Sequence, residues 1–80
     1  MLELKDVKEA LSDVGVSGVE FLRNEQLLAS KFCYDLQMDS LDLQDFISKI
    51  ENKTGTSLPH HARDGALTVK KFIKICNTCK

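Results

Sequence analysis

The residues best suited to chemistry are a serine flanked by carboxylates, Asp39-Ser40-Leu41-Asp42, at the start of the clearest helical pattern in the chain. A serine there lies beside free backbone N–H groups and the positive end of the helix dipole, which both favour a phosphate ester on its hydroxyl. The same residues also suit an ordinary helix start, because Asp39 is a good N-cap and Asp42 follows three residues later. From this tetrapeptide alone, a structural role and an attachment site both stay open.

The cysteines and histidines do not form a convincing site. Cys33, Cys76 and Cys79 are an odd number, and only the last two have CxxC spacing. That pair ends the chain instead of opening a helix, and a zinc site needs about four ligands. Adjacent His60 and His61 cannot share one helix face. We expect no metal site and reduced thiols in the cytoplasm, since no secretory signal opens the chain, and the role of Cys76 and Cys79 stays open.

Length and composition limit the class of protein. The chain has 80 residues, 42% hydrophobic and 29% charged, with a formal net charge of -1. We expect one soluble domain over residues 1–80, present as a monomer and too small to enclose a catalytic cavity of its own. The balanced charge argues against nucleic acid as a partner. No apolar stretch approaches the roughly 18 residues of a membrane span, so no membrane insertion is expected.

Three stretches repeat apolar residues with the three-and-four spacing of a helix. The stripes are Leu4, Val7, Leu11 and Val14; Leu43, Phe46, Ile47 and Ile50; and Val69, Phe72, Ile73 and Cys76. Gly15 and Gly55 are expected to end the first two helices, the second of which spans residues 39–53, and Thr68 is the expected N-cap of the last. No segment alternates like a strand, so the fold class is all-α.

The 23 residues from 16 to 38 lack a clear period but carry too many apolar side chains for disorder. We expect an ordered connection held to the core by large side chains such as Phe21, Leu27 and Phe32, with room for a helical turn. Another short turn is expected over residues 60–66. The predicted architecture is a small bundle of three main helices plus a short fourth, with a long ordered loop between the first and second helices.

One large apolar side chain is expected on the solvent-facing side of its helix. At about 100° per residue, Leu41 lies opposite the buried stripe, on a face shared with Asp45, Ser48 and Asn52. A single exposed leucine is common. Beside a serine at the positive end of a helix, it suggests a surface that another protein contacts.

The segment around the serine resembles the signature of acyl carrier proteins. It reads Phe32-Cys33-Tyr34-Asp35-Leu36-Gln37-Met38-Asp39-Ser40-Leu41-Asp42. In that family a Phe precedes an acidic-Asp-Leu-Gly step and then the Asp-Ser-Leu attachment site. The match continues through Asp45, Ile47, Ile50 and Glu51 to Leu58-Pro59, and through Leu67-Thr68-Val69. The resemblance covers nearly the whole chain and is strongest from Phe32 to Pro59.

The resemblance implies a carrier with no catalytic residues of its own. A phosphopantetheinyl transferase, using coenzyme A and Mg²⁺, would link 4′-phosphopantetheine to the hydroxyl of Ser40. The thiol of that arm would hold acyl intermediates as thioesters for acyl-loading and acyl-processing enzymes. The surface implied for docking these partners is made of Asp39, Leu41, Asp42, Asp45 and Glu51.

The chain also departs from the family pattern. Gln37 stands where Gly is usual, and Lys49, Asn52 and Lys53 dilute a helix face that is commonly rich in Glu. Lysines 70, 71, 74 and 80 form what we interpret as the solvated face of the last helix. Because docking by charge depends on an acidic surface, a net charge of -1 favours specialised or polyketide-type synthesis over standard fatty-acid synthesis.

Two functions from different classes remain. The alternative to a carrier is a non-modified helical interaction module, a degenerate carrier that only docks a partner; an intact Ser40 favours the carrier. Phe46 and Phe72 are expected to fill the core, so we expect a short or polar acyl group held outside it, although Thr54 thins the wall. The acyl group, the pathway, the partner synthase and the apo or holo state stay open.

Overall fold

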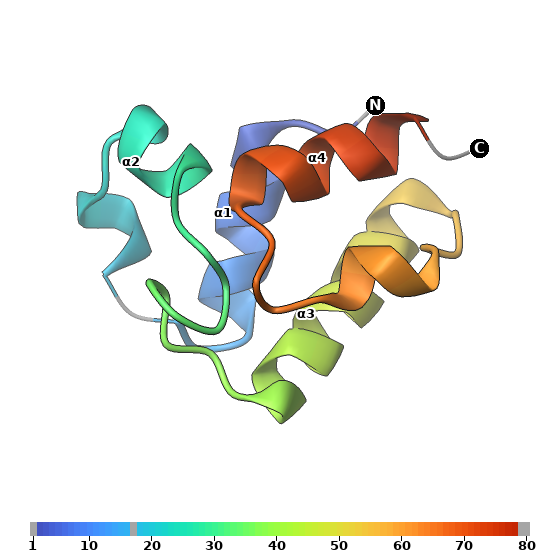
Figure 1. The fold of residues 1–80 in the computed structure, drawn as a ribbon, viewed down its shortest axis with the longest axis horizontal. Helices are drawn as coiled ribbons and strands as arrows, with labels where there is room; N and C mark the ends of the chain where they lie inside the picture. The colour runs from blue at the N-terminus through green and yellow to red at the C-terminus, as the bar shows by residue number, and fades with distance from the viewer. Residues whose placement is uncertain (1, 17, 79–80) are drawn as a thin grey trace.

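The computed structural model describes residues 2–16 and 18–78, whose regular secondary structure is entirely helical apart from one isolated bridge between Lys31 and Thr68 (Figure 1). The four α-helices are α1 (Leu4–Asp13), α2 (Asn24–Leu28), α3 (Ser40–Thr54) and α4 (Val69–Thr78). Two short 3-10 helices are η1 (Val19–Phe21) and η2 (His60–Arg63). The predicted all-α class with three main helices is therefore confirmed.

α1 forms because its apolar residues fall on one face. Val7, Ala10 and Leu11 are buried, and α1 packs against α3. The helix begins where the backbone N–H of Glu3 donates to the carboxylate of Asp6, at 3.0 Å. It ends as predicted, because Gly15 has a φ of 89°, a left-handed conformation that costs glycine little.

The connection from residue 18 to Met38 is ordered and contains two short helices, η1 and α2. Leu27, Phe32 and Met38 are buried and attach it to the core. Phe21 does not: 84% of its surface is exposed, because η1 turns it away from the domain. The short fourth α-helix of the bundle is thus α2, and the turn predicted over residues 60–66 is the 3-10 helix η2.

The end of this connection pairs with the segment that leads into α4. The N–H of Cys33 donates to the carbonyl oxygen of Gly65 at 3.0 Å, and the N–H of Val69 donates to that of Ser30, also at 3.0 Å. This pairing brings Phe32 beneath α3 and α4. Its ring centroid lies 5.1 Å from that of Phe46 and 5.3 Å from that of Phe72.

α3 is the longest helix, and its inner face is the predicted stripe. Leu43, Phe46, Ile47 and Ile50 are all buried. α3 ends at Gly55, whose φ of 68° is again left-handed. The helix covers residues 40–54, one residue later than predicted at each end, because Asp39 caps it from outside.

α4 packs against α2 and η2, and it crosses in front of α1 in the view of Figure 1. The hydroxyl oxygen of Thr68 accepts a hydrogen bond from the N–H of Lys71 at 3.2 Å, as expected of the predicted N-cap. Val69 and Phe72 are buried, whereas Ile73 and Cys76 are half-buried. Near its other end, Asn77 exchanges hydrogen bonds of 2.8 and 3.1 Å with the backbone of Leu2. Among the described residues, no helix has the length and apolar character that crossing a membrane requires.

Gly65 pairs with Cys33 of the connection and has no room for a side chain. A Cβ added there would lie 2.8 Å from the Cβ of Cys33 and closer still to its sulfur. We expect Gly65→Ala to lower the free energy of unfolding by about 1–3 kcal/mol, the usual effect of overpacking, measured by urea denaturation.

The matched control is Cys33→Ala, made alone and together with Gly65→Ala. It removes the sulfur that the new methyl group meets, so the double variant should lose less than the sum of the two single changes. Additive losses, or a Gly65→Ala variant as stable as the parent, would contradict this packing.

Candidate functional site

Ser40 is the first residue of α3, and its side chain is exposed. The carboxylate of Asp39 accepts a hydrogen bond from the N–H of Asp42 at 2.8 Å, which is the predicted N-cap interaction. The first backbone bond of the helix joins the N–H of Leu43 to the carbonyl oxygen of Asp39. The N–H groups of Ser40 and Leu41 therefore have no partner within the helix. They are the donors that a phosphate on the serine would meet.

Leu41 lies on the outer face of α3, as the helical phase predicts. Of its surface, 69% is exposed, and it is one of three large hydrophobic side chains among the described residues to be so exposed. Asp45, one turn later, is also exposed, as are Ser48 and Asn52. The predicted placement of this face is confirmed, whereas its role in docking stays a prediction.

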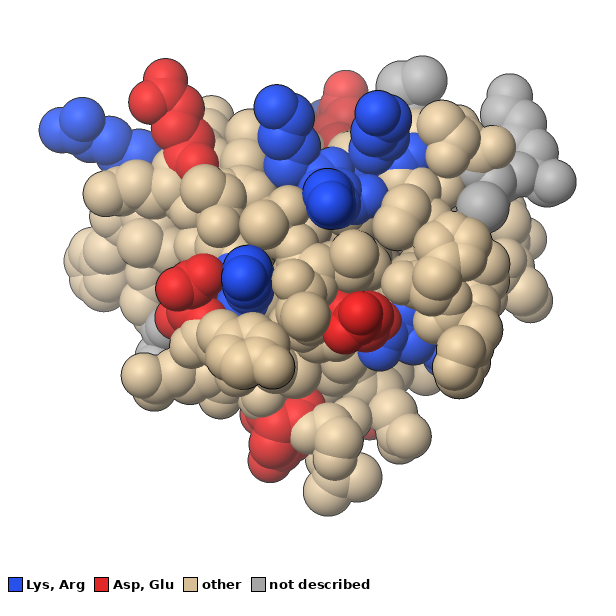
Figure 2. All heavy atoms as spheres, viewed as in Figure 1, with Lys and Arg blue, Asp and Glu red and all other residues tan. Residues whose placement is uncertain are grey.

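Charge is unevenly distributed between α3 and α4. Asp39, Asp42 and Asp45 lie within the first two turns of α3, and none of them forms an ion pair with a described residue. Figure 2 shows lysine and arginine side chains gathered over α4, away from the start of α3 at the lower edge. A partner with a basic surface is thus attracted to the end of the molecule that carries Ser40.

Glu51 differs from the other four residues predicted to dock partners. Its oxygen Oε2 accepts a hydrogen bond from the N–H of Leu58 at 2.7 Å and another from the guanidinium of Arg63 at 3.0 Å. Only 24% of its side chain is exposed. The carboxylate holds the loop after α3 and the end of η2 against the helix, so it has a structural role that the sequence did not reveal.

Cys33 lies just below the serine end of α3. Burial, and then the nearby carboxylates of Asp39 and Asp64, raise the pKa of the Cys33 thiol above its ordinary value. The thiol therefore stays protonated near neutral pH, which disfavours a nucleophilic role.

The other cysteines and the histidines form no cluster with Cys33. Cys76 is half-buried, and Cys79 falls outside the described residues, so the geometry of the CxxC pair is not described. His60 and His61 are both exposed in η2. Within residues 2–16 and 18–78, no three potential ligands come together around a metal position.

Gln37 has a left-handed backbone, with a φ of 56°, and no other non-glycine residue of the described chain has a positive φ. Such a conformation costs about 1–2 kcal/mol for a residue with a Cβ and is easiest for glycine. Gln37 occupies the position where acyl carrier proteins usually have Gly. The left-handed turn at position 37 explains why glycine suits this position, whereas this chain has a glutamine.

No protein-family model matches this chain, and no solved structure matches it either. The resemblance to acyl carrier proteins therefore depends on the residues quoted above.

Loss of the Glu51 carboxylate should loosen the loop after α3. We expect Glu51→Ala to cost about 1–3 kcal/mol of unfolding free energy, because the N–H of the buried Leu58 loses its acceptor. Arg63→Ala should cost at most about 1 kcal/mol, since it removes only a partly exposed ion pair. Thermal and urea unfolding measure both.

Glu51→Gln is the control, because the amide oxygen can still accept from Leu58 while the charge is lost. It should stay close to the parent in stability. If Glu51→Ala were equally harmless, the carboxylate would not anchor this loop.

Proposed function

We propose that this protein is an acyl carrier protein, with 4′-phosphopantetheine attached to the hydroxyl of Ser40. The observation that carries the proposal is the exposed serine at the first residue of α3, beside the exposed Leu41 and next to two backbone N–H groups without helical partners. These features coincide with the part of the chain that resembles the attachment site of the family. The exposed hydroxyl is accessible from solvent, so an enzyme could dock over it and present a phosphorus atom to its oxygen.

The attachment reaction follows from the chemistry of coenzyme A. The Ser40 oxygen attacks the phosphorus atom that bears the pantetheine arm, and the pyrophosphate bond breaks. The serine proton passes to a base of the phosphopantetheinyl transferase, and adenosine 3′,5′-bisphosphate leaves, its charge neutralised by Mg²⁺. No base of this chain is needed beside the serine. The new phosphodiester is stabilised by the start of α3.

Once attached, the arm carries an acyl group as a thioester on its terminal thiol. Acyl-loading and acyl-processing enzymes would bind the outer face of α3 through Leu41, Asp42 and Asp45. Docking raises the effective concentration of the thioester at the enzyme, so the domain needs only to be recognised. The carrier itself performs no catalysis, and it would act in the cytoplasm.

The core supports a short or polar cargo held outside it. Phe46 of α3 and Phe72 of α4 are completely buried, and their ring centroids are 5.3 Å apart. A fatty chain would have to separate these rings to enter between the two helices, and a close-packed core resists this. The limited acidic charge of α3 likewise favours a specialised pathway over bulk fatty-acid synthesis.

A second candidate is a helical interaction module that is never modified. Phe21, Tyr34 and Leu41 expose 84, 67 and 69% of their surfaces, and such side chains could contribute to a binding surface. Such a module has no need for a serine at the start of α3. The two functions differ in one measurable property, the modification of Ser40.

Incubation with coenzyme A, Mg²⁺ and a broad-specificity phosphopantetheinyl transferase should add one arm to the protein. Intact-mass spectrometry measures the addition, and fragmentation should place it on Ser40. Ser40→Ala should block it while changing the unfolding free energy by less than about 0.5 kcal/mol, because Asp39 and not Ser40 caps α3. An unmodified parent, or the same yield from Ser40→Ala, would refute the carrier function.

Leu41→Ala should slow this modification about tenfold in kcat/KM, the effect of removing an apolar anchor from an interface. Thermal stability should be nearly unchanged, because the side chain is exposed in the free protein. Ser48→Ala, on the same face one turn beyond Asp45, is the matched control. If Leu41→Ala melted the domain, Leu41 would be a core residue.

The electrostatic part of the same surface is tested with Asp45→Lys. Reversal of this exposed charge should slow association with the transferase, and added salt should reduce the difference from the parent. A difference that does not change with salt would mean that Asp45 acts through a short contact and not through its charge.

A further inference from the structure

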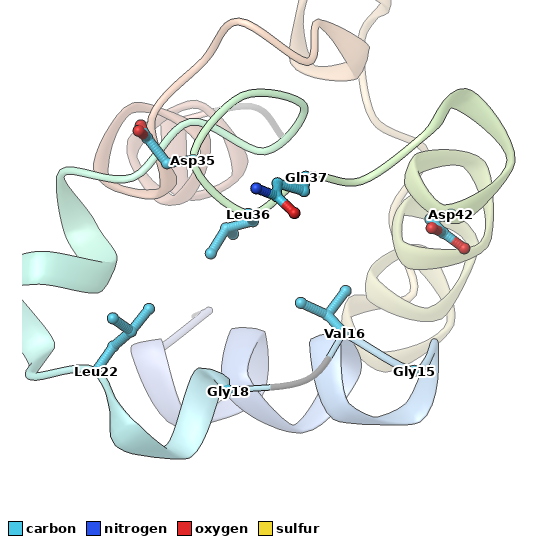
Figure 3. A pocket seen from close by; sticks show the side chains of 8 residues that line it. All are labelled: Gly15, Val16, Gly18, Leu22, Asp35, Leu36, Gln37 and Asp42. Atoms are coloured by element: carbon cyan, nitrogen blue, oxygen red, sulfur yellow. The ribbon is translucent and has the colours of Figure 1, made fainter.

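A hollow of about 340 Å³ opens beside the start of α3, between the turn after α1 and the last part of the connection (Figure 3). It is separate from the core between α3 and α4. The lining residues are Gly15, Val16, Gly18, Leu22, Asp35, Leu36, Gln37 and Asp42. Asp42 and Ser40 both belong to the first turn of α3, so the hollow lies at the same end of that helix as the proposed attachment site.

The surface that lines the hollow is mostly polar, with three apolar side chains among its residues. Val16 and Leu22 point into it from one side, and Leu36 approaches from the other (Figure 3). All three are half-buried and pack against the core. The amide of Gln37 also reaches toward the hollow, and Asp42 stands at its edge on α3 (Figure 3). Neither of these polar side chains has a hydrogen-bond partner among the described residues.

Gln37 is the unusual member of this set. Its φ of 56° is strained for any residue with a Cβ, and glycine would relieve that strain. The protein nevertheless has at this position a side chain whose amide faces the hollow. Strain of this kind persists when the surrounding structure imposes it, and it is found most often at functional sites.

The surroundings of the hollow strengthen this interpretation. Each of the three highly exposed hydrophobic residues is next in sequence to a lining residue: Phe21 to Leu22, Tyr34 to Asp35 and Leu41 to Asp42. The backbone at each of these three residues therefore lies beside the hollow. Exposed apolar side chains are common near binding sites.

We infer that the hollow binds the pantetheine part of the arm carried by Ser40, an inference that rests on the proposed function. Pantetheine alternates apolar and polar units: two methyl groups on one carbon, a hydroxyl, and two secondary amides joined by methylenes. The methyl and methylene groups suit Val16, Leu22 and Leu36. The amide N–H groups can donate to Asp42 or to the Gln37 oxygen, and an amide oxygen can accept from the Gln37 nitrogen.

Size and tethering support this occupant. A volume of 340 Å³ is at the small end of ligand sites, enough for the arm but not for the arm with a long acyl chain. Asp42 is two residues from Ser40, about 3 Å along the helix axis. Attachment therefore presents the arm to the hollow at an effective concentration of about millimolar, so a weak affinity is enough to hold it. The arm rests on this face until a partner enzyme displaces it.

The test compares the methyl NMR spectra of the apo protein with those of the protein loaded at Ser40. The methyl groups of Val16, Leu22 and Leu36 should shift on loading and show nuclear Overhauser contacts with the two methyl groups of the arm. Gln37→Gly and Gln37→Ala both remove the amide, and only the first relieves the strain. Both should reduce the equilibrium constant for binding of the arm in the hollow about fivefold, the effect of one lost hydrogen bond. Asn52→Ala, which removes an exposed amide far along α3, should leave it unchanged.

The outcomes separate this inference from the proposed function. If mass spectrometry shows the arm on Ser40 but shifts are confined to the start of α3, the hollow does not bind it and the inference is overturned. If the arm cannot be attached, the proposed function fails, and millimolar free pantetheine is titrated in its place. Shifts of the same three methyl groups would then support the hollow as a pantetheine site, and their absence would refute it. Shifts that appear only when the transferase is added would assign the hollow to a partner's side chain and overturn the inference.

Discussion

Three phenylalanine rings hold together segments of the chain that are otherwise far apart. Phe32 of the long connection, Phe46 of α3 and Phe72 of α4 are fully buried, with ring centroids 5.1 to 5.3 Å from one another. Their mutual contact fixes the connection against both helices. It thereby determines where the chain leaves the core and where α3 begins at Ser40. The position of the candidate site follows from this cluster, because Ser40 is the first residue of α3 and its exposed side chain does not pack into the core.

The helices could be predicted from the sequence because their apolar residues follow a strong local period. The caps at Asp39, Thr68 and Gly55 were predictable for the same reason, since each depends on neighbours within four residues. The pairing of Cys33 with Gly65, the loop contact of Glu51 and the exposure of Phe21 were not. They depend on contacts between residues that are distant in sequence, and such contacts leave no periodic pattern in a single sequence. The hollow was missed as well, and its one local signal was a glutamine in place of the usual glycine at position 37.

The proposed function combines a close-packed core with an exposed serine that is modified at the surface. The core leaves little room for a cargo, so in the proposed carrier the acyl group and the arm would stay at the surface. At the serine end of α3, exposed Leu41 and the carboxylates would be recognised by a partner, and we propose that the hollow beside Gln37 holds the arm. Leu41, the carboxylates and Gln37 all lie within five residues of Ser40. This concentration on one serine distinguishes a carrier from a general interaction module, whose binding surface needs no attachment point.

The central claim is that Ser40 carries a covalent 4′-phosphopantetheine arm in the cell. The most direct measurement is the intact mass of the protein isolated from its native source, followed by fragmentation of the peptide that contains Ser40. The account predicts a mass increased by one arm, localised to that serine, with an additional acyl group released by hydroxylamine. An unmodified mass, in cells whose transferase modifies other carriers, would contradict it and leave the interaction module as the function.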